Sequence, residues 1–171
     1  MVKYRLSNKL MKKLNDELIY HVTNNSIHSV IYLLKKGANV NYTDDRGYFP
    51  LYIAIENEYI DLTKILLEYN SDVNQTDANG NTPLFLLCTN LMNNNTIELF
   101  DALIQYGANV NHINYDNITP LICVCLANNK YLIDKLIQCN VHIGYKNDYG
   151  LTVFNYCKNP KVIEYLNLYN K

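Results

Sequence analysis

Apolar residues recur along the chain at one repeating distance. Adjacent apolar pairs lie at Leu33-Leu34, Leu66-Leu67, Leu103-Ile104 and Leu136-Ile137, with steps of 33, 37 and 33 residues between them. The same steps separate Pro50, Pro83, Pro120 and Val153. Within one period, Ile60, Leu62, Ile65, Leu66 and Leu67 have the spacing of a helix that is buried on one side. These two landmarks in one register predict similar helical units that stack, because no unit can bury its apolar face alone.

Threonine, proline, glycine and asparagine mark the expected ends of the helices. Thr82-Pro83 is typical of a helix start, because the hydroxyl caps free N–H groups and proline fits the first helical position. Second helices are expected to end in a left-handed residue at Gly37, Asn70, Gly107 and Asn140. The turns that connect successive units are expected at Gly47, Gly80, Asn117 and Gly150. Each unit is therefore predicted to contain two helices and a connecting turn.

Two stretches of the third period carry the motif of a known family. Residues 77–84 read Asp-Ala-Asn-Gly-Asn-Thr-Pro-Leu, and residues 103–111 read Leu-Ile-Gln-Tyr-Gly-Ala-Asn-Val-Asn. They resemble the D-x-x-G-x-T-P-L opening and the L-L-x-x-G-A-D-V-N close of the ankyrin repeat. The resemblance implies an all-α ankyrin-repeat solenoid, a single domain over residues 1–171 with about five stacked helix-turn-helix units and degenerate terminal caps. The expected units are about 14–43, 44–76, 77–113, 114–146 and 147–171.

The chain departs from the family pattern at one position of the first helix. Where the family has a histidine, this chain has Tyr52, Phe85, Ile122 and Asn155. We therefore expect irregular capping hydrogen bonds but an unchanged fold.

The first dozen residues fall outside the repeat register. They begin an amphipathic segment with apolar Leu6, Leu10, Met11, Leu14 and Leu18 and basic Lys9, Lys12 and Lys13. We expect a capping helix laid over the first unit, and the alternative is contact with an anionic membrane or a partner groove. Without an apolar run of about 20 residues or a signal peptide, the sequence favours a cytoplasmic protein without membrane contact, in the host cytoplasm or nucleus if viral.

Side chains that commonly carry chemistry are dispersed. The cysteines are Cys88, Cys123, Cys125, Cys139 and Cys157; they lack CxxC spacing and are expected to be free thiols. Cys88 and Cys125 occupy a small-residue position of the first helix, where we expect them buried in place of alanine. The four histidines are also spread over the chain, so no metal site is predicted. Because no GxSxG, HExxH, P-loop or GxGxxG motif occurs, we expect neither an enzyme nor a cofactor.

Charge is unevenly distributed although the net charge is only −1. From Asp44 to Asp116 there are eleven acids against the two bases Arg46 and Lys64, whereas both ends of the chain are mildly basic. The near-zero total argues against direct nucleic-acid binding. The acidic middle favours a protein partner with a basic surface.

The family resemblance also implies where a partner binds. Ankyrin proteins use the tips of their turns and the exposed face of their first helices. The corresponding positions in this chain are Asp45, Arg46, Tyr48, Glu56, Asn57, Asn79, Asn81, Thr89, Asn90, Tyr115, Asp116, Ile118 and Leu126. Tyr48 and Tyr115 are expected to be anchors, because tyrosine offers contact area at low entropic cost. Ile118 and Leu126 are apolar where solvated residues are expected and indicate a contact patch.

Four extra residues lengthen the third unit. They fall within residues 90–95, where we expect a loop between the two helices. A tolerated insertion is the simpler interpretation, and the alternative is a contact loop with Leu91 and Met92 at its tip.

One asparagine per unit has a second interpretation. Asn41, Asn74 and Asn111 each follow a leucine by eight residues, which resembles the sites of ankyrin proteins that are modified by an asparaginyl hydroxylase. The simpler interpretation is that these asparagines are turn residues of the repeat.

The residue bias adds a hypothesis about the source. The chain is rich in Asn, Tyr and Ile, and with its degenerate caps it resembles the short ankyrin proteins of poxviruses and other large DNA viruses. This resemblance implies a monomer that binds a host signalling protein or transcription factor and modulates innate immune or NF-κB signalling. The sequence shows no F-box-like segment after its last repeat, which favours a competitor over an adaptor. The alternative is a structural scaffold or the regulatory subunit of an enzyme complex, with no immune role.

Overall fold

The computed structural model describes residues 8–89 and 94–170, which form ten helices and no strand. The helices are α1 (Asn8–Thr23), α2 (Ile27–Lys35), α3 (Pro50–Glu56), α4 (Ile60–Glu68), α5 (Pro83–Thr89), α6 (Asn94–Gln105), α7 (Pro120–Leu126), α8 (Lys130–Gln138), α9 (Val153–Tyr156) and α10 (Pro160–Asn167). None of the described helices is long and apolar enough to cross a lipid bilayer. The all-helical prediction is therefore confirmed for the described residues.

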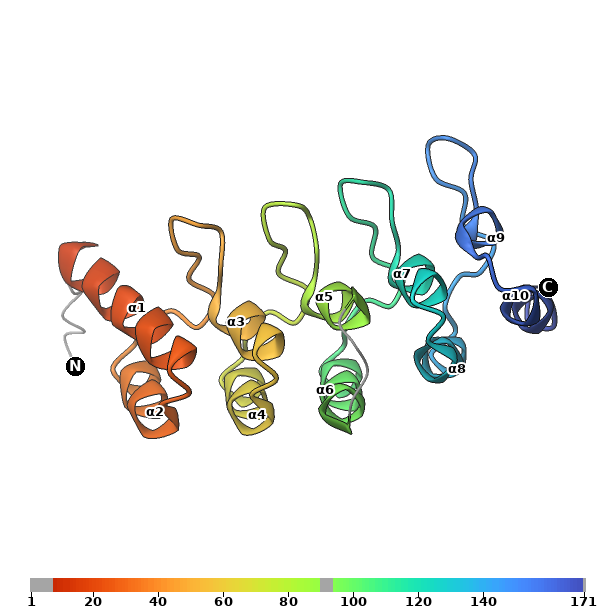
Figure 1. Cartoon of the computed structure of the whole chain (residues 1–171). Coiled ribbons are helices and arrows are strands. Elements are labelled where there is room, and N and C mark those ends of the chain that lie inside the picture. Colours follow the sequence, from red (N-terminus) through yellow and green to blue (C-terminus); the bar gives the residue numbers. More distant parts are fainter. Residues whose placement is uncertain (1–7, 90–93, 171) are drawn as a thin grey trace.

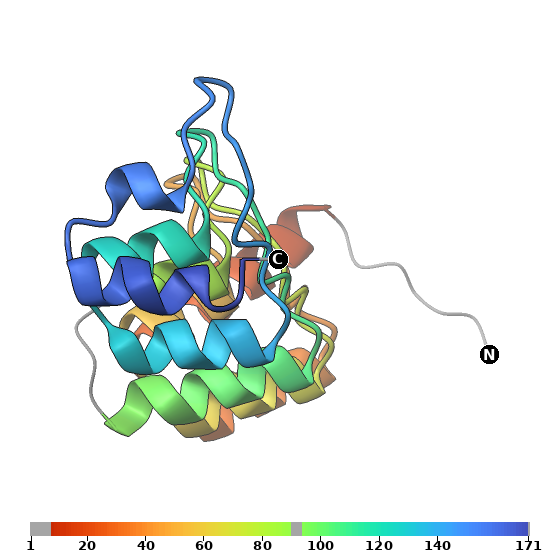
Figure 2. The same cartoon turned by 90° about the vertical axis from the view of Figure 1, so that its right-hand side faces the viewer.

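The helices form two parallel rows (Figure 1). The first helices of the pairs, α1, α3, α5, α7 and α9, lie side by side in one row, and α2, α4, α6, α8 and α10 form the second row. Between each second helix and the next first helix the chain makes a long hairpin-shaped loop, and all four loops project to the same side (Figure 2). We call these four segments, residues 36–49, 69–82, 106–119 and 139–152, the finger loops.

The core lies between the two rows, where the repeating leucines meet. Leu66, Leu103 and Leu136 of the second helices have no exposed surface, and Leu51, Leu84 and Leu121 of the first helices are equally buried. Tyr52, Phe85 and Ile122, which replace the family's histidine, are buried as well. Apolar burial of this kind drives the stacking of units.

The starts of the first helices differ in their caps. The hydroxyls of Thr82 and Thr119 accept hydrogen bonds from the N–H groups of Phe85 and Ile122, at 3.2 and 3.3 Å. Phe49 stands at the corresponding position before α3, where it is buried and caps nothing with its side chain.

The expected left-handed residues all have positive φ. At the ends of second helices these are Gly37, Asn70, Gly107 and Asn140, and in the finger loops they are Gly47, Gly80, Asn117 and Gly150. A third set with positive φ, which was not predicted, lies in the short connections between paired helices and consists of Asn25, Glu58 and Asn128. Asparagine tolerates this conformation, whereas for Glu58 it is uncommon.

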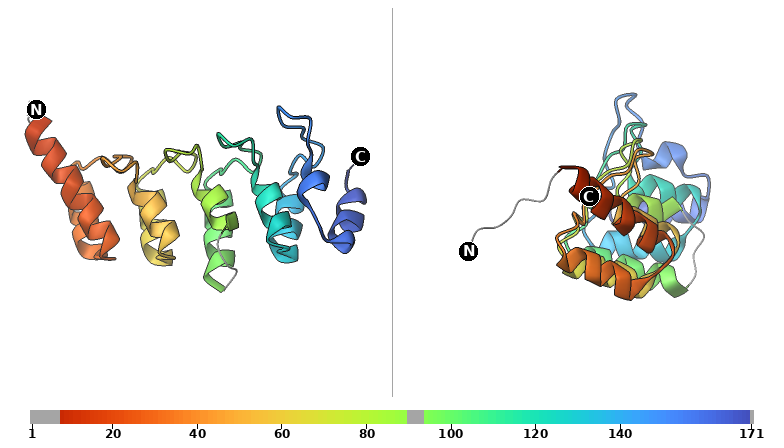
Figure 3. Two further views of the ribbon diagram at one scale, coloured as in Figure 1. Left: turned by 45° about the horizontal axis from the view of Figure 1, so that its top comes forward. Right: turned by 90° about the vertical axis from the view of Figure 1, so that its left-hand side faces the viewer.

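The amino-terminal segment differs from its prediction. Instead of a separate cap laid over the first unit, residues 8–23 are the first helix of the first pair, and α1 packs on both α2 and α3. In Figure 3 it forms the end of the stack. Leu18 is fully buried there while Leu10 is exposed, because α1 extends beyond its neighbours. Leu6 lies outside the described residues.

The insertion of the third unit is only partly a loop. Asn94 and Asn95 begin α6, which has 12 residues where α4 and α8 have nine. The prediction of a loop over residues 90–95 is thus wrong at its carboxyl end, because a second helix absorbs part of the added length. Leu91 and Met92 lie outside the described residues.

Asparagine side chains join successive units through backbone groups. Oδ1 of Asn41 accepts the N–H of Asp72 at 2.8 Å, and Oδ1 of Asn74 accepts that of Asn109 at 2.8 Å. Asn111 continues the series with the N–H of His142 at 2.7 Å. Asn15 of α1 begins it by accepting the N–H of Asn39 at 2.8 Å, although it does not stand at the repeat position that Asn41, Asn74 and Asn111 share. This asparagine ladder satisfies backbone donors that a loop would otherwise leave to water.

Candidate partner-binding surface

The predicted contact residues fall into two rows along the solenoid. Asp45, Arg46, Asn79, Tyr115 and Asp116 lie at the tips of three finger loops. Glu56, Thr89 and Leu126 are the last residues of α3, α5 and α7, and all three are exposed. A helix of seven residues is about 10 Å long, so each first helix holds its last residue well away from its finger loop. We call the surface made by these two rows the finger face. Asn57 adjoins it as the carboxyl cap of α3, and Asn90 lies outside the described residues.

Each finger tip is shaped by one side chain that accepts two backbone N–H groups. Asp44 Oδ1 accepts from Arg46 at 3.0 Å and Tyr48 at 2.9 Å. Asp77 and Asn114 make the same pair of bonds two and four residues ahead of themselves, as does Asn147. Because aspartate and asparagine serve equally, the carbonyl-type oxygen and not the charge is what this turn requires.

A guanidinium and two stacked aromatic rings order the first finger loop, residues 36–49. Asp44 holds the guanidinium of Arg46 through bonds of 3.0 and 2.9 Å, and that guanidinium lies 5.1 Å from the ring centroid of Tyr48. The Tyr48 ring stacks in turn on Tyr52, with centroids 5.1 Å apart and planes 13° apart. Burial, reinforced by the carboxylates of Glu56 and Asp77, raises the pKa of Tyr52 to about 12. Tyr48 is consequently half-buried and presents one edge of a rigid stack.

Hydrogen bonds join the second finger loop, residues 69–82, to the third, residues 106–119. Tyr115 N–H donates to the carbonyl of Asn79 at 3.1 Å, and Asn114 Nδ2 donates to Asn81 Oδ1 at 2.9 Å. His112 Nε2 lies 2.8 Å from the carbonyl oxygen of Gly80. These bonds hold Tyr115 in place although 74% of its surface is exposed. Asn81 is used for this structural purpose and is only half-exposed.

The two apolar residues of the predicted patch differ in environment. Leu126 is 55% exposed at the end of α7, as expected for a contact residue. Ile118 is partly buried against the core, so its apolar character is explained by packing. The sequence could not separate these cases, because the repeat register says which element a residue belongs to and not how deeply the neighbouring unit covers it.

The acidic bias is divided between the two sides of the solenoid. Four of the eleven acids belong to the second row: Asp61 and Glu68 on α4, and Glu98 and Asp101 on α6. Two of these pair with lysines, Lys64 with Glu98 and Lys135 with Asp101. On the finger face, the acids that do not shape a turn are Asp45, Glu56 and Asp116, all exposed. The negative charge of the finger face is therefore smaller than the sequence count indicates.

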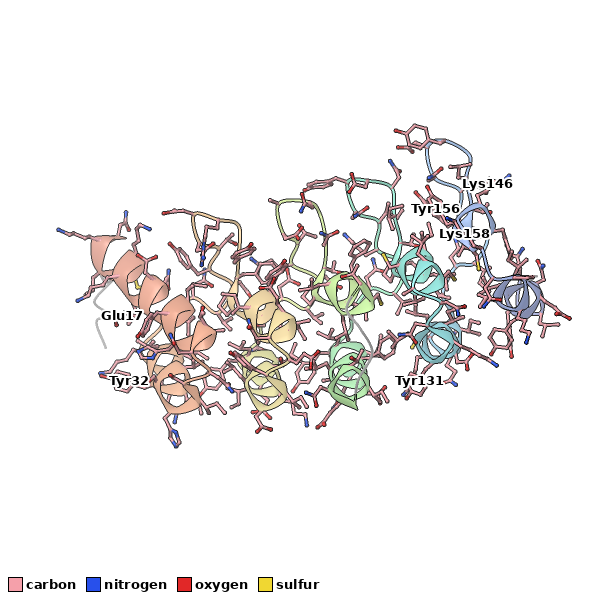
Figure 4. The ribbon with its side chains drawn as sticks, in the orientation of Figure 1. Glu17, Tyr32, Tyr131, Lys146, Tyr156 and Lys158 are labelled. Carbon is pink, nitrogen blue, oxygen red and sulfur yellow. The ribbon has the colours of Figure 1, made fainter. Side chains whose placement is uncertain are left out.

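The last finger loop adds residues that the sequence analysis assigned only to a terminal cap. Tyr149 is 78% exposed at its tip. Tyr156 at the end of α9 and Lys158 after it are labelled in Figure 4, and with Leu126 they line a hollow of about 320 Å³ between α7 and α9. Carrying the family's contact positions into the fifth unit would have found this part of the finger face.

The thiols are sequestered. Cys88 and Cys125 are buried as predicted, and burial raises the pKa of both. Burial also raises the pKa of Cys123 to about 12. Within residues 8–89 and 94–170, no three His, Cys, Asp or Glu side chains gather as a metal site would need.

A comparison with family models matches residues 18–114 to the model described as ankyrin repeats (3 copies). The match covers more than half of the chain and runs from the last turns of α1 past the end of α6. A comparison with curated proteins found no match. Ankyrin repeats indicate a module for protein–protein interaction. The paired helices, the finger loops and this match together lead to one conclusion: the chain belongs to the ankyrin-repeat family.

Proposed function

We propose that the protein binds a partner protein through its finger face. The carrying observation is that exposed anchor residues, Tyr115 and Leu126 above all, stand on loops and helices whose positions hydrogen bonds fix in advance. A preformed surface loses little conformational entropy on binding, which favours affinity. The protein acts as a monomer that competes for its partner and performs no chemistry of its own.

We further propose that the partner surface is basic. Asp45, Glu56 and Asp116 are exposed on the finger face, while the positive charge of Arg46 is already matched by Asp44. Lys12 Nζ of α1 lies 4.0 Å from Asp45 Oδ2, and both side chains are exposed. Because such an ion pair is weak, a cation of the partner can displace Lys12 from Asp45 at little cost. Opposite charges across an interface accelerate association, and salt weakens this effect.

The compositional resemblance to viral ankyrin proteins supports one class of partner. A host signalling protein or transcription factor with a basic recognition segment fits both the acids of the finger face and that resemblance. The alternative, a scaffold or regulatory subunit without an immune role, uses the same surface with a subunit of a stable complex.

The test begins with the purified chain as bait in a eukaryotic cell extract, followed by mass spectrometry. Each captured protein is then purified and its affinity is measured for Tyr115→Ala, Leu126→Asp and Glu56→Lys. Loss of about 2 kcal/mol is expected for at least one of the first two, as for interface hot spots. Glu56→Lys should slow association, mainly at low salt.

Glu68→Lys is the matched control, because it makes the same charge change on exposed α4 in the second row. It should leave binding unchanged. If Glu68→Lys impairs binding and the three finger-face variants do not, the proposal is wrong and the partner uses the second row. If Glu56→Lys changes the binding only of captured proteins whose surfaces are acidic, the proposal of a basic partner is wrong, whereas the proposal that partners bind the finger face is retained.

A further inference from the structure

A second hollow lies on the other row of helices, between α8 and α10. It has a volume of about 400 Å³, and the ring of Tyr165 and Leu168 supply its exposed apolar surface, above the buried Ile133 and Val162. Leu168 is 64% exposed at its edge. The hydrogen bond of 2.6 Å from Asn159 to Asn128 separates this groove from the hollow of the finger face, since both asparagines line both cavities. The groove is thus a distinct surface.

Ion pairs join neighbouring helices of the second row from α4 to α8, but not across this groove in the described residues. Lys64 of α4 pairs with Glu98 of α6, and Lys135 of α8 pairs with Asp101 of α6 at 2.7 Å. Each of these contacts therefore joins one helix of the second row to the next. Between α8 and α10 the described residues form no such ion pair, although Lys130 and Lys161 both stand at the groove.

The acids near the groove do not neutralise these lysines. The Lys130 ammonium lies over the ring of Tyr165, 5.3 Å from its centroid, and not on a carboxylate. The nearby Asp134 carboxylate of α8 raises the pKa of Tyr165. Glu164 is the one acid that lines the groove, against the two lysines. The groove therefore combines an apolar floor with a net positive rim.

We propose that the groove between α8 and α10 binds an acidic peptide segment of a partner protein. One apolar side chain of that segment packs against Leu168 and the ring of Tyr165, and carboxylates on either side of it contact Lys130 and Lys161. The peptide carboxylates thus pair with Lys130 and Lys161 as Glu98 and Asp101 pair with Lys64 and Lys135 elsewhere in the second row. This site is independent of the finger face, and its occupant has the opposite charge to the partner proposed there.

The experiment is a selection from a random 12-residue peptide library displayed on phage, with the full chain as the target. Selected peptides are synthesised with a fluorophore, and their affinities are measured by anisotropy at two salt concentrations. We expect peptides in which acidic residues flank a large apolar residue. The Lys130→Glu/Lys161→Glu double variant and Leu168→Asp should each lower their affinity at least tenfold, and higher salt should weaken their binding to the parent.

Lys146→Glu is the matched charge control, because Lys146 is an exposed lysine of the last finger loop without an ion-pair partner in the described part of the chain. It should bind within about twofold of the parent, and circular dichroism should show that all variants keep their helices. Peptides without an acidic bias, groove variants that bind like the parent, or a selection that enriches nothing would overturn the proposal. Acidic peptides that lose affinity only in Leu126→Asp would also overturn it while leaving the finger face as a binding surface.

Discussion

The ring of Tyr115 lies against the backbone of Gly80 in the preceding finger loop. A Cβ atom built on Gly80 would come within 2.8 Å of Tyr115 Cδ1, closer than such atoms can approach without movement. Gly80 also has a φ of +77°, a region that other residues rarely adopt. One glycine thus serves both the turn and the contact between two units.

Gly80→Ala is expected to destabilise the protein more than Gly47→Ala. Both positions have positive φ, which costs a residue with a side chain about 1–2 kcal/mol. At Gly47 the nearest atom to a new Cβ would be Ala78 Cβ at 3.5 Å, an ordinary contact, so only the backbone cost applies. Urea unfolding should show the additional cost at Gly80 alone. In a Tyr115→Ala background this additional cost should disappear; equal effects of the two glycine substitutions in the parent would contradict the packing argument.

Asn74→Ala is expected to lower the free energy of unfolding by about 0.5–1.5 kcal/mol, because it removes two hydrogen bonds to exposed backbone groups of the next unit. Asn74 accepts the N–H of Asn109 and donates to the carbonyl of Gly107 at 3.1 Å. Asn79→Ala is the control, since Asn79 is exposed at a finger tip. Thermal unfolding followed by circular dichroism measures both variants. Similar midpoints for the two would mean that the asparagine ladder contributes nothing to stability.

Asp44 is expected to contribute stability that depends on pH. Partial burial raises its pKa, but the N–H groups of Tyr48 and Arg46 and the Arg46 guanidinium outweigh this, so the pKa lies below its ordinary value. A lowered pKa in the folded state means that the contribution is present at neutral pH. It is lost as the pH falls below about 4 and through the folded pKa.

Two substitutions separate the hydrogen bonds of Asp44 from its charge. Asp44→Asn should cost less than about 1 kcal/mol at pH 7, because Asn114 and Asn147 shape their turns with the same amide oxygen and the ion pair with Arg46 is exposed. Its difference from the parent should vanish in acid. Asp44→Ala should cost about 1–3 kcal/mol at every pH where the protein is folded. Urea unfolding between pH 3 and pH 7 tests both, and a pH-independent difference between Asp44→Asn and the parent would refute the charge contribution.

The buried thiols are expected to react slowly in the native protein. Burial raises the pKa of Cys88, Cys123 and Cys125, so almost no reactive thiolate is present at pH 8. Iodoacetamide labelling followed by peptide mass spectrometry should find these three cysteines modified far more slowly than in urea. Labelling of Cys88 at the rate seen in urea would contradict the burial.

Local signals in the sequence determined the helix pairs and their turns. Proline at Pro50, Pro83 and Pro120 sets the start of a helix through its own backbone geometry, and the left-handed turn residues act within a few positions of the chain. The spacing of leucines predicted the buried side of each helix. For the candidate site, the family resemblance implied contact positions at Leu126 and Tyr115, and both are exposed.

Only the tertiary structure decided what each unit does to its neighbour. Stacking partly buries Ile118 but leaves Leu126 exposed, distributes one acidic stretch over two sides, and opens a groove between α8 and α10 whose lysines have no carboxylate partner in the described residues. It also turned the expected amino-terminal cap into α1 and part of an expected loop into α6. These outcomes depend on residues about 30 positions apart being brought together. A helix start depends on its nearest neighbours, whereas burial and charge pairing depend on how complete units pack.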